Sequence, residues 1–205
     1  MSSMTEQQGA SGKRAAQGRA TRGQLIEVAT RLFAEHGYEG TSIEAVLTAA
    51  GVSRGALYHH FAGKEALFEA VVVAITAGVT ARMAEAISEC TDPVDAVRTG
   101  ALAWIGLAGD PVIQQVVLVD APSVLGWERW RTMDDGQTLG AMKAMLQAVS
   151  DTGRLPSALV DPFAHMILAA LDEFALVVAR APDTGAAVAE GSVAVEELIN
   201  RLLRP

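Results

Sequence analysis

The apolar residues of this chain recur at intervals of three and four positions, which is the spacing of one face of an α-helix. Between residues 22 and 36, for example, apolar side chains stand at positions 25, 26, 29, 32 and 33. Strand signals are nearly absent, because no alternating run is bounded by an Asn-Gly or Asp-Gly turn. The pattern therefore predicts an all-α fold of about nine helices.

Residues that favour helix ends divide the first third of the chain into short helices. A capping box that begins at Thr21 starts the first helix, and Gly37 suits its C-terminal cap. A second box begins at Thr41, and Gly51 ends that helix. Ser53 then caps a third helix, which runs to about position 60. Two short helices joined by a tight glycine-containing turn predict a helix-turn-helix unit.

The rest of the chain is punctuated by prolines, which stand where one helix ends and the next can begin. A long helix is predicted first, from Lys64 to about Ser88. The helices predicted after it cover about 93–108, 111–119, 123–150, 162–180 and 186–203.

Composition locates the charge. Half of the 205 residues are apolar and 20% are charged, so an ordered globular protein is expected. The net charge of −8 is uneven: residues 1–62 hold six basic and five acidic residues, whereas residues 63–205 hold ten and nineteen. Phosphate binding depends on Lys and Arg. A surface that binds an anion is therefore expected in the first third or at its border.

The sequence also bears on location and cofactors. Residues 1–20 are polar, lack the apolar core of a signal peptide and are expected to form a flexible arm. The longest uncharged apolar stretch, 70–81, is shorter than the roughly 20 residues of a membrane helix, so a cytoplasmic protein without membrane contact is expected. Cys90 is the single cysteine, so neither an internal disulfide nor a CxxC zinc site can form. No cofactor or metal is expected.

One stretch of the chain resembles the DNA-binding domain of the TetR family of transcriptional regulators. The residues that carry the resemblance are AGVS at 50–53, Leu-Tyr at 57–58, Phe61, Lys-Glu at 64–65 and Leu67.

The resemblance covers about residues 21–70 and implies an organisation for the whole chain. A helix-turn-helix DNA-binding domain is expected over 21–66, after the arm at 1–20. A helical ligand-binding and dimerisation domain is expected over 67–205, on length and helical pattern rather than on a motif.

The third helix has a buried face and an outward face. On a helical wheel Leu57 and Phe61 point together into the core, and His59 lies opposite them. Gly55 and Ala56 keep the outward face small, so the backbone could approach a DNA major groove closely.

Polar residues around this face are the predicted DNA contacts. Arg54 could bind a guanine through two hydrogen bonds, although a phosphate or solvent-facing role stays open. The resemblance implies that Tyr58 touches a phosphate or a thymine methyl, and that Lys64 at its helix start binds phosphate. Capping is the alternative role for Thr41 and Ser42. The full predicted set is Thr41, Ser42, Ser53, Arg54, Gly55, Ala56, Tyr58, His59, His60 and Lys64.

The adjacent His59 and His60 raise an enzyme or metal site as an alternative. Adjacent helical positions diverge by about 100°, whereas a helical metal pair needs a spacing of three or four. His36 and His165 are remote in the sequence. The sequence therefore favours a protein that is not an enzyme.

The last two predicted helices, 162–180 and 186–203, are expected to join two copies of the chain, as the resemblance implies. The first of them is apolar on all sides, which is typical of a helix covered from both sides. Dimers of helix-turn-helix proteins match two recognition helices to a pseudo-palindromic site.

A ligand cavity is expected among the middle helices, because apolar and aromatic side chains with few polar groups are typical of such pockets. Plain core packing is the alternative for each residue. The candidates are Trp104, Asp120, Trp127, Trp130, Met142, Met145, His165, Met166 and Asp172.

The function predicted from these observations is a homodimeric repressor. It binds a double-stranded DNA operator and is released by a small apolar or aromatic effector. The alternative is a regulator that binds DNA constitutively and has no small-molecule ligand.

Overall fold

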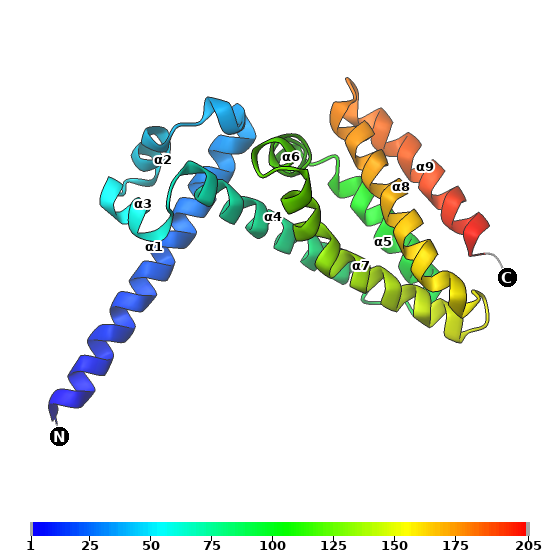
Figure 1. Cartoon of the computed structure of the whole chain (residues 1–205), viewed down its shortest axis with the longest axis horizontal. Helices are drawn as coiled ribbons and strands as arrows, with labels where there is room; N and C mark the ends of the chain where they lie inside the picture. Colours follow the sequence, from blue (N-terminus) through cyan, green and yellow to red (C-terminus); the bar gives the residue numbers. More distant parts are fainter. Residues whose placement is uncertain (1, 204–205) are drawn as a thin grey trace. The chain divides into compact units, whose positions relative to one another are not determined.

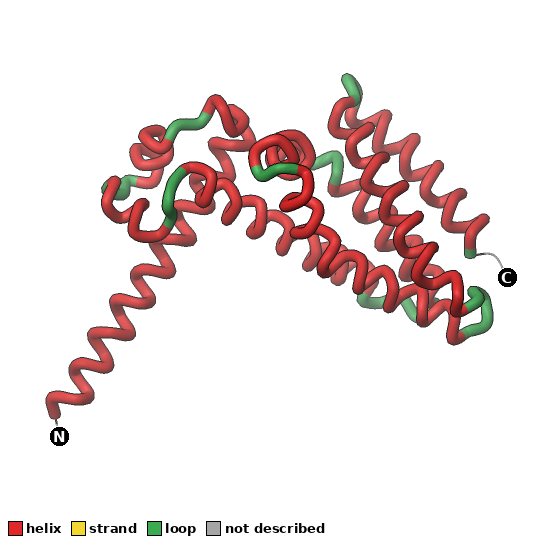
Figure 2. The backbone as a smooth tube through the Cα atoms, in the orientation of Figure 1, coloured by secondary structure: helices red, strands yellow, loops and turns green. Residues whose placement is uncertain are grey.

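The computed structural model describes residues 2–203, with the backbone alone described for 2–15, 127 and 131–137. Every element in that part of the chain is helical, which confirms the all-α prediction (Figures 1 and 2). The chain divides into two compact units, Met1–Ala74 and Ile75–Pro205. The elements are α1 (Ser2–Gly40), α2 (Ile43–Ala50), α3 (Arg54–His60), α4 (Lys64–Ile87), α5 (Pro93–Leu107), the π-helix η1 (Ile113–Asp120), α6 (Ala121–Val124), α7 (Trp127–Asp151), the 3-10 helix η2 (Ser157–Leu159), α8 (Val160–Arg180) and α9 (Thr184–Leu202).

The first unit packs α1, α2, α3 and the start of α4 around an apolar core. Phe33 of α1 and Phe68 of α4 are both 0% exposed and meet edge to face, with ring centroids 5.1 Å apart. Leu57 and Phe61 are 0% and 4% exposed, which confirms the predicted inward face of α3. Because Phe68 belongs to this core, the unit extends to Ala74, beyond the boundary expected at residue 66.

The N-terminal helix is longer than the sequence predicted. Thr21 does not start a helix: it lies inside α1, where its hydroxyl donates to the carbonyl of Gln17 at 3.0 Å. The stretch expected as a flexible arm holds four alanines and three glutamines, which favour helix, and no proline, and α1 runs through it despite three glycines. Gly37 (φ 70°, ψ 172°) breaks the helical backbone near the other end, and α1 continues to Gly40.

The capping box predicted at Thr41 is wrong by one residue. Ser42 is the N-cap of α2, and its hydroxyl accepts from the Ala45 amide at 3.1 Å. Thr41 is 2% exposed, with its Oγ1 2.9 Å from the carbonyl oxygen of Gly37, a contact that draws it into the core. The cap at Ser53 is confirmed, since its Oγ accepts from the Ala56 amide at 3.2 Å.

Helices α5, α7, α8 and α9 form the body of the second unit, with α8 and α9 side by side (Figure 1). Ile105 of α5, Leu146 of α7, Ile167 of α8 and Ile199 of α9 are each 0% exposed. They belong to one apolar core.

The break predicted before position 123 lies elsewhere. Pro122 stands in the first turn of α6, where a missing N–H costs no hydrogen bond. The chain instead breaks at Gly126, whose φ of 82° favours glycine. The predicted helix 111–119 is largely η1, a π-helix.

Two helices of the described chain are long and apolar enough to cross a membrane by length and composition. They are Lys64–Ile87 and Ser157–Arg180, each with a mean hydropathy of 1.6, and only 28% and 33% of their most apolar windows are buried. Core helices of soluble proteins pass the same test. The second of them includes α8. Because only a third of its apolar window is buried, much of its apolar surface is uncovered within a single chain.

Candidate nucleic-acid interface and ligand cavity

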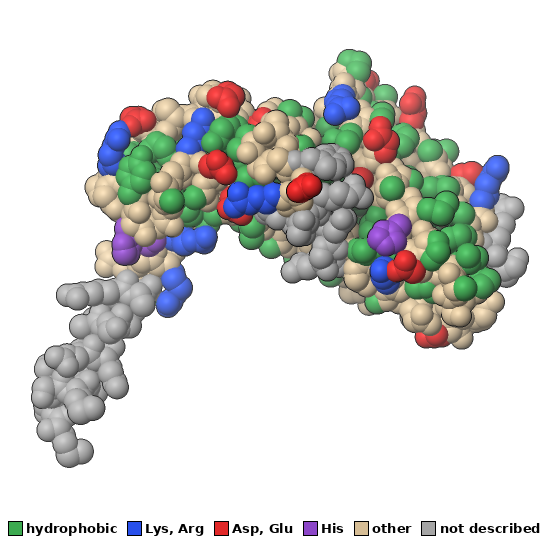
Figure 3. All heavy atoms as spheres, in the orientation of Figure 1, with side chains coloured by type: hydrophobic (Ala, Val, Ile, Leu, Met, Phe, Trp, Pro, Cys, Tyr) green, Lys and Arg blue, Asp and Glu red, His purple; other side chains and the backbone are tan. Residues whose placement is uncertain are grey.

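Helix α3 presents small and polar residues away from the core of its unit. Tyr58 is 47% exposed, and Arg54, Gly55 and His59 are also exposed. Ala56 is half-buried. Histidine side chains and Lys or Arg side chains lie close together on the visible face of this unit (Figure 3). The arrangement leaves the first turns of α3 accessible to a groove of DNA.

Arg54 already has an anionic partner. Its Nη2 donates to Oε1 of Glu44 on α2, and the two side chains are 61% and 63% exposed. A contact with DNA must therefore replace or share this ion pair. A helical wheel could not predict this pairing, because a wheel represents each helix alone.

The rings of His59 and His60 pack edge to face, and the two side chains differ in exposure. His60 is half-buried, and its Cε1 lies 3.8 Å from the position that a Cβ at Gly18 of α1 would take. The His59 and His60 ring centroids are 5.0 Å apart. His60 thus turns towards α1, whereas His59 is exposed beside the outward face.

Lys64 lies over an aromatic ring. Its Nζ is 4.1 Å from the ring centroid of Tyr38, a cation–π contact. Burial raises the pKa of the Tyr38 hydroxyl, and the carboxylates of Glu65 and Glu39 raise this pKa further.

Two predicted DNA contacts stand at the start of α2. Ser42 is exposed, whereas Thr41 is buried. Thr41 therefore presents no side-chain surface to a phosphate.

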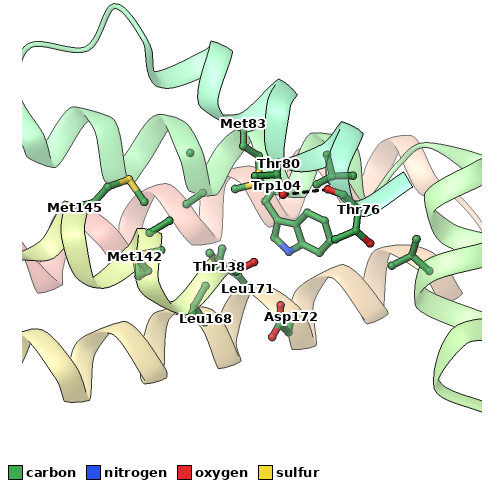
Figure 4. A pocket seen from close by; sticks show the side chains of 15 residues that line it. Thr76, Thr80, Met83, Trp104, Thr138, Met142, Met145, Leu168, Leu171 and Asp172 are labelled. Atoms are coloured by element: carbon green, nitrogen blue, oxygen red, sulfur yellow. Dashed lines mark hydrogen bonds between the residues drawn. The ribbon is translucent and has the colours of Figure 1, made fainter. Parts of the chain in front are cut away.

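The second unit contains a cavity of about 80 Å³ between α4, α5, α7 and α8 (Figure 4). Four of the predicted ligand residues line it: Trp104, Met142, Met145 and Asp172. The remaining described lining residues are Thr76, Val79, Thr80, Met83, Gly100, Ala101, Val117, Thr138, Ala141, Leu168 and Leu171.

The wall formed by α4 was not predicted from the sequence. Thr76, Val79, Thr80 and Met83 stand at positions i, i+3, i+4 and i+7 and so share one face of that helix. Their periodicity is present in the sequence. Because the stretch 70–81 is apolar on every face, however, the sequence does not indicate which face lines a cavity.

Four predicted cavity residues lie elsewhere. His165 and Met166 are on the surface of α8, with His165 Nε2 3.9 Å from Asp161 Oδ2 and Met166 58% exposed. Trp130 is 7% exposed, and its indole N–H donates to the Val117 carbonyl at 3.0 Å. Asp120 ends the π-helix outside the lining. The Trp127 side chain lies outside the described residues.

The position of His165 along α8 explains why it does not line the cavity. His165 and Asp172 share a helix face, but Asp172 lies at the cavity, whereas His165 lies about two turns nearer the helix start. There it sits beside Asp161, which pairs with Lys143. The sequence pattern of an apolar helix predicts which face a residue lies on. It does not predict which other helices cover each end of that face.

Both units match known protein families. The family described as "Bacterial regulatory proteins, tetR family" matches residues 25–71. The family described as "Tetracyclin repressor-like, C-terminal domain" matches residues 94–202.

Curated relatives match part of the chain. The HTH-type transcriptional repressor AcnR of Corynebacterium efficiens is 48% identical over 69 residues, which are 34% of this chain and 35% of that protein. The HTH-type transcriptional repressor KstR2 of Mycobacterium tuberculosis is 32% identical over 81 residues, or 40% of each chain. The matches span between about a third and two fifths of the length of these relatives.

Solved structures share the whole fold. A TetR-family transcriptional regulator from Pectobacterium atrosepticum is 32% identical, with a TM-score of 0.80, over 93% of this chain and 97% of that one. The regulator FadR from Bacillus subtilis, solved in complex with stearoyl-CoA, is 22% identical with a TM-score of 0.72, over 86% and 96% of the two chains.

Proposed function

This chain belongs to the TetR family of DNA-binding transcriptional regulators, and on that premise we propose that it is a homodimeric repressor released from its operator by a small molecule. The observation that carries the proposal is the outward face of α3, where Arg54, Gly55, Tyr58 and His59 are exposed opposite a buried Leu57. The protein acts in the cytoplasm and has no enzymatic role in this proposal.

The proposed dimer forms through α8 and α9. On α8, Met166 and Val177 are 58% and 48% exposed, and on α9 Val193 is 70% exposed. A second copy would cover these apolar side chains. A symmetric pair of recognition helices about 34–36 Å apart would then match a pseudo-palindromic operator.

Helix α4 is the proposed link between ligand and DNA. Phe68, near its start, belongs to the core of the first unit, and Thr76 to Met83 form a wall of the cavity. An effector that prefers a different position of this wall would shift the population away from the DNA-binding state. The complex of Bacillus subtilis FadR with stearoyl-CoA supports ligand binding in this fold.

Operator binding is tested with genomic duplexes and purified dimer. Specific binding should weaken steeply as salt rises, because each phosphate contact releases counterions. Tyr58→Ala should reduce specific affinity and leave the dimer intact, and Val73→Ala, another exposed apolar residue of the first unit, serves as the control. Operator affinity unchanged in Tyr58→Ala would contradict the role of α3.

Dimerisation is tested by light scattering on Val193→Asp. Two opposed carboxylates on a buried apolar face would drive the protein to a monomer. Val119→Asp is the matched control, since Val119 is 46% exposed and lies on η1. If the Val193→Asp variant were still a dimer, this result would contradict a role for α9 in the interface.

A regulator without a ligand is the second candidate, and the size of the cavity favours it. At about 80 Å³ the cavity is well below the roughly 300–1,000 Å³ of typical ligand sites. Thermal shift with a compound library separates the two, because a compound that binds the folded state raises its melting temperature. A hit that also lowers operator affinity supports the ligand-responsive function, and the absence of any such hit supports constitutive binding.

A further inference from the structure

Trp104 has a buried indole N–H without a hydrogen-bond acceptor. Its Nε1 is shielded from solvent and has no partner among the described residues. The indole of Trp130 differs, because it donates to the Val117 carbonyl at 3.0 Å. Buried donors nearly always have acceptors, and an unpartnered one destabilises the folded state. A missing acceptor at Trp104 therefore calls for an explanation.

The surroundings of Trp104 are those of a binding site rather than of a filled core. The residue lines the cavity, and Figure 4 shows its ring lying across the space with the nitrogen directed towards the side formed by Thr138, Leu171 and Asp172. Met83 of α4 and Met142 and Met145 of α7 also line the cavity, and their flexible side chains adapt to different shapes. A ligand here would meet a mostly apolar surface and the directed donor of Trp104.

The charge of the lining restricts the acceptor. Asp172 supplies a carboxylate, and no Lys, Arg or His stands among the described lining residues. An anionic head group would be costly to desolvate in this mostly apolar cavity, and no cation among the described lining residues would offset that cost. The hydroxyl of Thr80 is already engaged, since it donates to the Thr76 carbonyl at 3.0 Å. The acceptor that fits is an uncharged oxygen.

We propose that the effector is a compact, uncharged apolar molecule with a carbonyl oxygen, as in a ketone, ester or lactone, which accepts from Nε1 of Trp104. This inference rests on the ligand-responsive function proposed above. Compactness follows from the cavity of about 80 Å³. A free carboxylate is disfavoured in this proposal, because no cation stands among the described lining residues.

Three matched probes test the inference on the full-length dimer: cyclohexanone, methylenecyclohexane and cyclohexanecarboxylate. The readout is the indole N–H resonance of Trp104 in a ¹⁵N–¹H spectrum. Cyclohexanone should move that resonance downfield in a saturable manner. Methylenecyclohexane, which has the same shape without the oxygen, should bind at least tenfold more weakly, and the carboxylate should not bind. Ketone binding that leaves the resonance in place would overturn the inference.

Trp104→Phe keeps an aromatic ring and removes the donor. It should bind cyclohexanone no better than methylenecyclohexane, whereas Trp130→Phe, the control, should keep the preference. The Trp104 resonance is assigned by its loss in Trp104→Phe. If that variant does not fold, the resonance that persists in both Trp127→Phe and Trp130→Phe identifies it.

The failure of this inference and of the proposed function can be told apart. A ketone that moves the Trp104 resonance and leaves operator affinity unchanged would contradict ligand-responsive repression alone. A compound without a carbonyl that lowers operator affinity, while no ketone binds, would contradict the carbonyl inference alone.

Discussion

The guanidinium of Arg54 donates to the carboxylate of Glu44 across the turn between α2 and α3. Both side chains are more than 60% exposed, at 61% and 63%. Exposed ion pairs contribute only about 0–1 kcal/mol, so Arg54 can exchange Glu44 for a guanine or a phosphate. In the proposed complex with DNA, Glu44 would therefore compete with the DNA for Arg54, the principal candidate for a base contact.

Removing this competitor should strengthen DNA binding. Glu44→Gln keeps the size of the side chain and removes its charge. We expect affinity for the operator and for a scrambled duplex to rise by up to about fivefold, which corresponds to about 1 kcal/mol. Fluorescence anisotropy at low and high salt measures the effect, which should shrink as salt screens the charges. The control Glu85→Gln alters an exposed carboxylate of the second unit. Equal affinities for wild type and Glu44→Gln would contradict a competition between Glu44 and DNA for Arg54.

Substitutions at Thr41 and Ser42 should have different effects on the stability of the protein and on its affinity for the operator. Thr41→Val keeps the shape and removes the hydroxyl that contacts the carbonyl oxygens of Leu32 and Gly37, at 3.1 and 2.9 Å. Leaving these acceptors unpaired should cost about 1–3 kcal/mol of unfolding free energy. Operator affinity of the folded protein should change little, because Thr41 is buried. Urea unfolding and anisotropy measure the two quantities.

Ser42→Ala provides the comparison for that variant. The loss of its N-cap should cost about 1 kcal/mol, and the loss of an exposed hydroxyl at the start of α2 should also weaken operator binding. The reverse order, with the greater loss of affinity in Thr41→Val, would contradict the assignment of Thr41 to the core.

The recognition helix was predictable because its signals are local. Ser53 caps α3 and Leu57 is buried, and both follow from residues within one turn of each other. The partners of its polar side chains were not predictable, because they come from other helices. Glu44 meets Arg54, Tyr38 lies under Lys64, and α1 approaches His60 only once the unit has folded.

The cavity shows the same division between local and tertiary information. Trp104 and Met142 could be proposed from residue type alone. Met166 could not be excluded from the cavity on the sequence alone, because α8 is apolar all round. Its exposed face becomes evident only when α5, α7 and α9 cover its other faces. Length and propensity also misled at α1, where a polar stretch without proline continues the helix.

An ion pair in the second unit should make stability depend on pH. Arg154 donates to Asp92 at 3.1 Å between Nη1 and Oδ1, and its Nη2 lies 2.9 Å from Oδ2. The hydrogen bond from Arg154 holds the pKa of the Asp92 carboxyl below its ordinary value. Because the folded-state pKa is lowered, the stabilisation is present above the unfolded pKa of about 3.9 and is lost as pH falls through the folded pKa.

Asp92→Asn isolates the charge, since asparagine caps a helix about as well as aspartate. Asp92 also accepts from the Val94 amide at 2.8 Å, and the asparagine oxygen can keep this bond. We expect a lower melting temperature than wild type at pH 7, with the difference disappearing at low pH. Arg154→Met should abolish the same difference. A gap between wild type and Asp92→Asn that is constant from pH 7 down to pH 3 would contradict the role of the ion pair.

The contact between α8 and α9 depends on the absence of a side chain at Gly191. A methyl group there would lie 2.7 Å from Cδ1 of Phe174, closer still to its Cε1, and 3.3 Å from Cγ2 of Ile105. Phe174 packs against both apolar clusters of the unit, so its ring cannot move without disturbing them. Overpacking of this kind costs about 1–3 kcal/mol, and the better helix propensity of alanine returns about 1 kcal/mol.

Gly191→Ala should therefore be destabilised by up to about 2 kcal/mol in urea unfolding, despite the gain in helix propensity. Gly140→Ala is the matched control, because this glycine lies within α7, is exposed and has nothing within 4 Å of the added methyl. That variant should be more stable than wild type by about 1 kcal/mol. If Gly191→Ala were stabilised as much as Gly140→Ala, the ring of Phe174 would have room to turn aside, and the close approach of α8 and α9 would not require glycine at this position.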